Sequence, residues 1–253
     1  MFITSHANGL IVFQSSLLKD QSPLKHAFSS RKGGVSPAPF ESLNLGPDVG
    51  DDAENVPENR RRFLQILDAG VDRLAMGEQV HGNHVEIVSQ PGLYPATDGL
   101  ITARRGIVLA VKIADCVPLL FFDPVKTVLA VVHAGWRGVI YGIIPAAVQS
   151  MIDEFFVRPE NLLCAIGPSI RSCCYEIQRD VADRFDDDAI IRRDGKLFLD
   201  LIHVIKKHLE LLGLKPDNVD ISEYCTHCQG ELFFSYRRDG IHSGRMMLAA
   251  GLK

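Results

Sequence analysis

The chain has 253 residues, of which 46% are hydrophobic and 23% charged, and its formal net charge is −4. These values are typical of a globular protein with a sizeable core. No basic tract occurs, which argues against a nucleic-acid surface, and no apolar run approaches the roughly 20 residues of a membrane helix. The first residues lack the pattern of a secretory signal. We therefore expect a cytoplasmic protein whose six cysteines are thiols, metal ligands or core residues rather than disulfides.

Short apolar runs, typical of strands, alternate along the chain with amphipathic segments, typical of helices. Strands are predicted at residues 10–13, 26–28, 74–80, 84–88, 97–101, 106–113, 117–122, 128–132, 161–166 and 219–224. Helices are predicted at residues 55–68, 139–156, about 178–186 and 200–212. The alternation has no regular βαβ rhythm and no Rossmann or P-loop motif. We therefore expect a mixed α/β (α+β) fold, a single domain over residues 1–253 with packed mixed β-sheets flanked by helices.

A long segment rich in Gly, Pro, Ser and Asp, residues 31–52, separates the first strands from the first helix. This composition predicts a loop, and ordered loops of this length are often functional. Arg31 and Asn44 lie in it, beside glycines that would let the backbone approach a ligand. Both are candidate substrate-binding residues, with a solvated surface excursion as the alternative.

Three residues with side chains that can bind metal lie at the edges of predicted strands: His81, Cys116 and His133. Because strand ends bring distant residues to one rim of a sheet, they could lie together. Two imidazoles and one thiolate suit zinc, and three protein ligands leave a fourth position for water. Zinc would lower the pKa of that water and could polarise a substrate atom. The alternative is a buried thiol and two histidines satisfied by the core.

A second chemistry uses the same residues without metal. Cys116 could be a nucleophile with His133 as its base and Asp115 nearby. Elsewhere, Cys225-Thr-His-Cys228 is an isolated Cys-x-x-Cys motif. A structural zinc site would need a second pair, and the only other pair, the adjacent Cys173-Cys174, has poor geometry for a tetrahedral site. The simplest interpretation of Cys225 and Cys228 is therefore two incidental thiols.

Arginines and aromatic residues supply candidates for substrate binding. Arg31 and Arg137 lie in Gly-rich loops, and Arg237, Arg238 and Arg245 lie close together near the C-terminus. If these segments converge, the arginines would form an anion pocket, because guanidinium groups match phosphate or carboxylate with paired donors. The alternative is solvated surface charges. Trp136 lies in the Gly-Trp-Arg-Gly sequence at 135–138, which we interpret as a loop, and could stack on a flat heterocycle. Phe233, Phe234 and Tyr236 could do the same or could belong to the core.

Several blocks together resemble the signature of one bacterial family. The blocks are ADCVPLLFFDP…VVHAGWRG, SSRKGGVS…SLNLG…VGDD…VPENRRRF, QVHG, ATDGLIT, AIGPSI…CCYEI and FFSYRRDG…GRM. The family is known as multicopper polyphenol oxidoreductase (laccase), as peptidoglycan editing factor and as purine nucleoside phosphorylase. The resemblance covers most of the chain in the family's order.

The resemblance implies a zinc site made by His81, Cys116 and His133, which would also be the catalytic residues. It implies phosphorolysis of adenosine, inosine and methylthioadenosine, so that the partners are a purine nucleoside and phosphate, with some deamination of adenosine. It also implies a single α/β domain of packed mixed sheets. The family's loop arginines match at Arg31 and Arg237.

Other functions stay open at this point. Multicopper oxidases need roughly ten His ligands and a Cys, whereas this chain has nine His in all, although Cu²⁺ could bind the single triad. A cysteine hydrolase or peptidoglycan-editing factor acting on cell-wall precursors, and a non-enzymatic nucleoside-binding protein, are further alternatives. The chain could be a monomer or a dimer.

Overall fold

The computed structural model describes residues 1–253 and contains two large β-sheets and one small one. In spatial order, the seven-stranded sheet comprises β1 (Phe2–Ala7), β2 (Leu10–Ser15), β3 (Leu24–Ser29), β16 (Met246–Leu252), β8 (Val108–Ile113), β4 (Leu74–Gly77) and β6 (Gly92–Tyr94). The six-stranded sheet comprises β15 (Val219–Ile221), β11 (Leu163–Ile166), β9 (Val117–Asp123), β10 (Val128–Ala134), β7 (Gly99–Thr102) and β5 (Val85–Ile87). The small sheet comprises β12 (Glu176–Ile177), β14 (Lys196–Leu199) and β13 (Ile190–Arg193).

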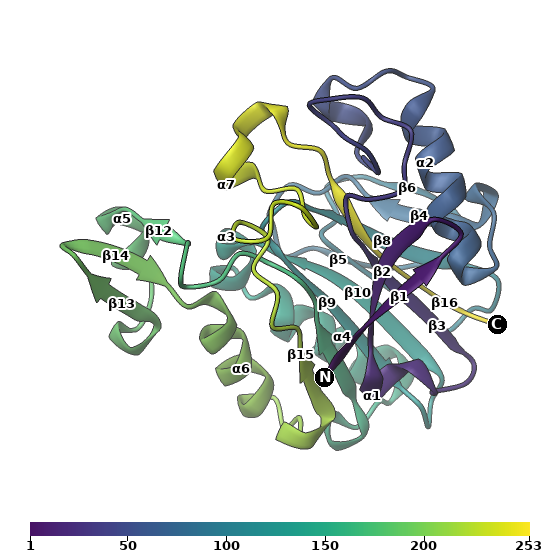
Figure 1. Ribbon diagram of the computed structural model, residues 1–253. Coiled ribbons are helices and arrows are strands. Elements are labelled where there is room, and N and C mark those ends of the chain that lie inside the picture. The colour runs from purple at the N-terminus through teal and green to yellow at the C-terminus, as the bar shows by residue number, and fades with distance from the viewer.

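Seven α-helices connect or cover these sheets: α1 (Ser16–Lys19), α2 (Asn55–Leu64), α3 (Trp136–Ile140), α4 (Ile143–Phe155), α5 (Arg179–Ala182), α6 (Leu201–Leu211) and α7 (Tyr236–Asp239). In Figure 1, α5 and the small sheet project to one side of the molecule, whereas α7 lies at the upper end of the large sheets. No helix combines the length and apolar character needed to cross a membrane.

Alternating side chains on β9 explain why the two large sheets stack. Successive residues of a strand point to opposite faces, so Leu119 and Phe121 join the core that includes α4 and α6. Leu120 and Phe122 point the other way, into the core shared with the seven-stranded sheet. Burial on both faces makes β9 and β10 continuous apolar runs in the sequence rather than alternating ones.

The outer face of the seven-stranded sheet is covered by α2. Phe63 and Leu64 of this helix pack with Val108, Ala110 and Met247 of β8 and β16 in a third core. The layers are therefore helix, sheet, sheet and helix, which confirms the predicted mixed α/β fold with packed mixed sheets and flanking helices.

Two details of the sequence interpretation were wrong. The predicted helix at 139–156 is two helices, α3 and α4, because Gly142 between them has a left-handed backbone with φ of 83°. The Gly-Trp-Arg-Gly sequence is not a loop, since α3 begins at Trp136. Six strands were not predicted: β1, β6, β12, β13, β14 and β16.

Candidate functional site

The pairing of β9 with β10 brings Cys116 and His133 together. In this antiparallel pair His133 lies opposite Pro118, and Ala134 lies opposite Val117. Cys116 immediately precedes β9, so it lies at the same edge of the sheet as His133, near the end of β10. The predicted convergence of strand ends is therefore seen for these two residues.

His81 reaches this edge because a buried carboxylate holds its turn. Asp98 is fully buried and accepts hydrogen bonds from the backbone N–H groups of Val80, His81 and Gly82 at 3.1, 3.1 and 2.8 Å. His81 itself has a left-handed backbone, with φ of 60°. These bonds satisfy three donors of a tight turn and fix the position of the His81 ring.

The same carboxylate orients His133. The Nδ1 atom of His133 lies 2.7 Å from Oδ1 of Asp98, which leaves Nε2 as the ring nitrogen free for a ligand. Burial raises the pKa of Asp98, but the bonds from His133 and Gly82 outweigh it and hold the pKa below its usual range. An ionised carboxylate behind a histidine is the usual arrangement around protein-bound metals.

The three side chains form one cluster. The ligand atoms of His81, Cys116 and His133 all lie within 4.8 Å of one another, and the two imidazole rings are close to perpendicular, at 78°. Burial raises the pKa of the Cys116 thiol, but the neighbouring charge of His133 and the contacts with both imidazoles outweigh it and lower the pKa. Burial lowers the pKa of His133, whereas Cys116 and Asp98 raise it by more. The geometry therefore favours a thiolate beside an imidazolium when no metal is bound.

Gly135 keeps space open beside this cluster. A Cβ atom at this position would lie 3.0 Å from Cδ2 of His81 and 3.1 Å from Sγ of Cys116. Any larger residue would push these two side chains away from their present positions.

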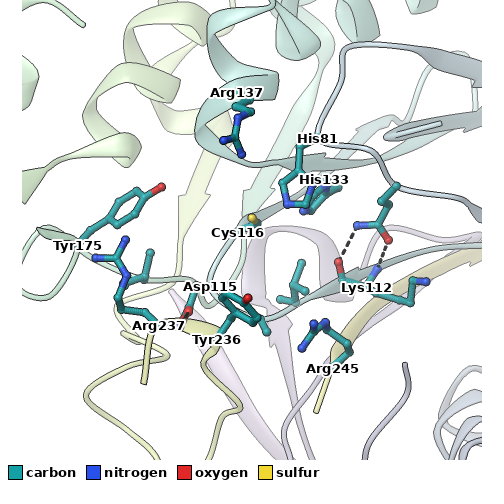
Figure 2. Close-up of a pocket in the computed structure, with 14 residues that line it drawn as sticks. His81, Lys112, Asp115, Cys116, His133, Arg137, Tyr175, Tyr236, Arg237 and Arg245 are labelled. Carbon is teal, nitrogen blue, oxygen red and sulfur yellow. Dashed lines mark hydrogen bonds between the residues drawn. The ribbon is translucent and has the colours of Figure 1, made fainter. Parts of the chain in front are cut away.

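A cavity of about 510 Å³ opens in front of the cluster. Figure 2 shows Cys116 at its centre, the two histidines on one side, and Tyr175 and Arg237 on the other. Four cationic side chains line the cavity: Lys112, Arg137, Arg237 and Arg245. Burial lowers the pKa of Lys112 and Arg245 from their usual values. The cavity therefore offers positive charge next to the predicted metal ligands, a combination that suits an anionic substrate.

The carboxylate of Asp115 lines the cavity but is already engaged. Its backbone is left-handed, with φ of 92°, and its oxygens accept hydrogen bonds from the hydroxyls of Thr226 and Ser235 at 2.6 and 3.0 Å. The backbone N–H of Arg237 also donates to it, at 2.7 Å. Asp115 thus holds α7 in place beside the cavity through its bonds to Ser235 and Arg237. The carboxylate that orients His133 is that of Asp98.

The structure brings some of the predicted substrate-binding residues to the cavity and not others. Arg137 and Arg237 line it. Trp136 is half-buried and lines a second cavity of about 700 Å³ instead, with the Arg137 guanidinium 4.5 Å from its ring centre. Arg31 instead donates to the carbonyls of Glu41 and Gly230.

Asn44 is fully buried and organises the loop between β3 and α2. Its amide donates to a carboxylate oxygen of Asp51 and to the carbonyl of Gly46, and its oxygen accepts from the backbone N–H of Arg245 at 2.9 Å. Arg31 and Asn44 therefore lie outside the cavity lining, and their roles in substrate binding stay predictions.

Sequence reasoning missed four residues of the site: Gln79, Asp98, Lys112 and Tyr175. Asp98 sits in the block ATDGLIT, directly before a strand that pairs with β10, so its position at the sheet edge was readable. Lys112 is the one charged residue in the apolar run of β8. Gln79 and Tyr175 carry no comparable signal, whereas Arg245 belongs to the C-terminal group of arginines that the sequence analysis named, and it lines the cavity.

A second group of ligand atoms was not expected. The sulfurs of Cys173, Cys174, Cys225 and Cys228 also lie within 4.8 Å of one another. The interpretation of Cys225 and Cys228 as incidental thiols overlooked that two turns, far apart in the sequence, meet here.

Comparison with known proteins places the chain in a family. A family model described as multi-copper polyphenol oxidoreductase laccase matches residues 25–253. The chain belongs to this family. The resemblance stated from the sequence blocks is thereby confirmed.

Relatives in this family are purine nucleoside phosphorylases. The enzyme named purine nucleoside phosphorylase YlmD from Geobacillus stearothermophilus is 35% identical over 241 residues, which cover 88% of each chain. A purine nucleoside phosphorylase from Deinococcus radiodurans is 38% identical over 231 residues, covering 90% of this chain and 88% of that one. The crystal structure of YlmD from G. stearothermophilus matches with a TM-score of 0.91 at 32% identity, over 98% of both chains.

Proposed function

We propose that the protein is a zinc-dependent purine nucleoside phosphorylase. It would convert adenosine, inosine or methylthioadenosine and phosphate to the free base and a sugar 1-phosphate. One observation carries this proposal: the same cavity holds a His/Cys cluster suited to metal and four cationic side chains suited to phosphate. The names of the family relatives support the same reaction class.

The three side chains fit a zinc ion by their chemistry. Two imidazoles and a thiol converge, a buried carboxylate orients one imidazole, and Gly135 leaves room beside them. His81, Cys116 and His133 would hold the ion, with the cavity side left open for a substrate. Zinc would supply Lewis acidity toward an atom of the bound substrate. The same donors accept Cu²⁺, and we propose zinc as the resident metal.

The cationic residues of the cavity would bind and orient phosphate. In phosphorolysis an oxygen of phosphate attacks the anomeric carbon, the bond from that carbon to the base nitrogen breaks, and the departing base takes up a proton. Arg137, Arg237 and Arg245 supply forked donors that match phosphate oxygens, and Lys112 adds a compact positive charge. Holding both reactants in one cavity supplies most of the advantage that orientation can give.

Flat side chains beside the cluster would hold the base. Tyr175 and Tyr236 line the cavity, and Trp136 lines the second cavity, which Tyr175 also borders. Phe233 and Phe234 are fully buried, so they belong to the core and leave the stacking role to the tyrosines and Trp136.

Three further properties belong to the same proposal. The site would deaminate adenosine as a side reaction, in which water replaces the amino group and ammonia leaves. All six cysteines are free thiols, which suits the cytoplasm. The chain would act on its small-molecule partners as a monomer or a dimer.

The test combines metal analysis with a phosphate-dependent assay. Wild-type protein should release adenine from adenosine only when phosphate is present. Cys116→Ala should lose the metal of this site and at least about 100-fold in kcat/KM, because removing a ligand costs more than removing the groups behind it. Cys164→Ala removes a buried cysteine of β11 that lies outside both clusters and should retain both properties. A folded Cys116→Ala protein with full activity would overturn the proposal.

A second candidate function rests on the Asp98–His133–Cys116 arrangement. A carboxylate, an imidazole and a thiol in this order are the parts of a cysteine nucleophile with its base. The enzyme would then be a cysteine hydrolase, with cell-wall precursors as the candidate substrates. It predicts catalytic activity that survives chelation of metal and is abolished when Cys116 is alkylated.

A further inference from the structure

The four cysteines beside the cavity come from two separate turns. Cys173 and Cys174 lie in the turn at 172–174, and Cys225 and Cys228 begin and end the segment 225–228. Sγ of Cys228 is 3.2 Å from Sγ of Cys174 and 3.6 Å from Sγ of Cys173. All four thiols are free, so the structure gathers four soft donor atoms with no bond between them.

Specific contacts hold the two turns against each other. The backbone N–H of Thr226 donates to the carbonyl of Ser169 at 3.1 Å, within a parallel bridge that joins Ser169 to Cys225. The guanidinium of Arg171, directly before the first turn, donates to the carbonyls of Ser222 and Tyr224. The meeting of the sulfurs is therefore fixed by the backbone on both sides and does not depend on the thiols themselves.

The spacing of the sulfurs agrees with a tetrahedral site. Zinc–sulfur bonds of about 2.3 Å place the sulfurs of a tetrahedral tetrathiolate roughly 3.8 Å apart. The separations of the Cys228 sulfur from those of Cys174 and Cys173, 3.2 and 3.6 Å, lie below this value, and the 4.8 Å limit for all pairs lies above it. One tetrahedral ion engages all four sulfurs at once, whereas each disulfide joins only two of them.

Cationic side chains surround the cluster. The Arg193 guanidinium donates to the carbonyl of Cys173 at 3.0 Å, and that of Arg238 donates to the carbonyl of His227, inside the second turn, at 3.1 Å. Arg171 is half-buried on the same side. Four thiolates around a divalent ion carry two net negative charges, which Arg171 and Arg193 would offset, because Arg238 is already paired with the carboxylate of Asp239 at 2.7 Å.

We propose that Cys173, Cys174, Cys225 and Cys228 bind one zinc ion as a closed, structural site. Four sulfur ligands in tetrahedral positions are the donor set of structural zinc sites in proteins. This site is separate from the His81, Cys116 and His133 cluster, and the proposal does not rest on the phosphorylase activity.

The zinc site would stabilise one wall of the cavity. Tyr175 follows Cys174 in the chain and lines the cavity. Arg237 packs over the Tyr175 ring, 5.2 Å from its centre, and donates to the carbonyl of Glu176. Tyr175 and Arg237 also line the second cavity of about 700 Å³, so the ion would hold a wall shared between two cavities. The four cysteines are thus positioning residues.

Zinc content per chain tests the proposal in the full-length protein purified under reducing conditions. We expect two zinc ions in the wild type, one in Cys116→Ala, one in the double variant Cys173→Ser/Cys228→Ser, and none when all three changes are combined. Cys164→Ala should retain both ions. A zinc-free Cys116→Ala protein, or a disulfide among the four cysteines in the purified wild type, would overturn the proposal.

A second measurement keeps the test valid if the serine variants fail to fold. Cys116→Ala loaded with Co²⁺ should show the strong visible bands and the sulfur-to-cobalt charge transfer of a tetrahedral thiolate site. Absence of these bands would overturn the proposal. In addition, chelation of zinc from Cys116→Ala should increase hydrogen exchange at 171–177 and 225–229 and leave β9 unchanged. The two sites fail independently, because loss of activity in Cys116→Ala reports on the first cluster and the cobalt spectrum on the second.

Discussion

Two groups of ligand atoms, one facing the cavity of about 510 Å³ and one bordering the second cavity, differ in donors and surroundings. The group at the sheet edge has three mixed donors, backed by a buried carboxylate, and faces the cavity. The group in the turns has four sulfurs and lies at the flank. Cys116 and His133 lie at strand ends and His81 lies in a turn held by Asp98, so each segment contributes one ligand, whereas each cysteine turn contributes a pair. The local backbone therefore determines the number of ligands. Three ligands leave one metal position open, and four ligands close the site.

The largest expected effect is that of a substitution at Asp98, the buried carboxylate behind the three-ligand cluster. Asp98→Asn removes the charged partner of His133 and weakens the acceptor for three backbone N–H groups. We expect a 10- to 100-fold loss of metal affinity or kcat/KM and a free energy of unfolding lower by about 1–3 kcal/mol. Competition with a metal indicator measures the metal affinity, and steady-state kinetics measure kcat/KM.

Asp123 provides the matched control for this change. It is fully buried at the other end of β9 and accepts N–H bonds from Val125 and Lys126. Asp123→Asn should lower stability without changing metal affinity. If Asp98→Asn kept wild-type metal affinity and kinetics, as we expect of Asp123→Asn, the result would contradict a metal site at His81, Cys116 and His133 that Asp98 supports.

A smaller effect is expected for phosphate binding. Arg245→Met keeps the alkyl stem but removes the guanidinium from the cavity, so the KM for phosphate should rise about 10-fold, the value of one charged hydrogen bond. Arg31→Met is the matched comparison, because Arg31 donates to carbonyls outside the cavity. It should change the KM by less than about twofold. A larger effect would support the sequence-based prediction that Arg31 binds substrate.

The smallest expected effect is a difference between Cys116 and Cys173 in the pH dependence of alkylation in metal-free protein. Burial raises the pKa of Cys116 but its imidazole neighbours lower it by more, whereas burial and the contact with Cys228 raise the pKa of Cys173 to about 11. Alkylation of Cys116 should therefore reach half its maximal rate at lower pH than an ordinary thiol, near 8.5, and Cys173 at higher pH. Peptide mapping after iodoacetamide gives both profiles, and equal midpoints would contradict the proposed thiolate.

Cys116 and His133 also affect the free energy of unfolding, and their contributions depend on pH in opposite directions. The lowered pKa of Cys116 contributes stability that is lost as the pH falls through its folded value. The raised pKa of His133 contributes stability that is lost as the pH rises through its folded value. Metal-free protein should therefore gain most from the pair between these two pKa values.

The sequence predicted the fold where periodicity is strong. The apolar runs of β8, β9 and β10 and the amphipathic α6 lie within a few residues of their predicted bounds. It failed for β1, whose residues alternate weakly, and for β16, because MMLAAGL carries little strand propensity of its own. Pairing with β3 and β8 determines the structure of that segment. The single domain over residues 1–253 stays a prediction.

For the site, sequence motifs predicted the three ligand residues but not the residues that position them. His81, Cys116 and His133 were predicted, and they meet. The role of Asp98 depends on the pairing of β7 with β10, and the four-cysteine cluster depends on two turns meeting across about 50 residues of chain. Contacts of this kind are set by tertiary structure, which local patterns do not encode.

The place of β16 between β3 and β8 has a consequence for synthesis on the ribosome. Until residues 246–252 have emerged, the seven-stranded sheet consists of two separate groups, β1-β2-β3 and β8-β4-β6. Arg245, directly before this strand, joins the cavity at the same time. A nascent or truncated chain ending before β16 would expose both halves of the inner core and be a target for chaperones and proteases, so that a complete cavity would occur only in chains that have closed the sheet.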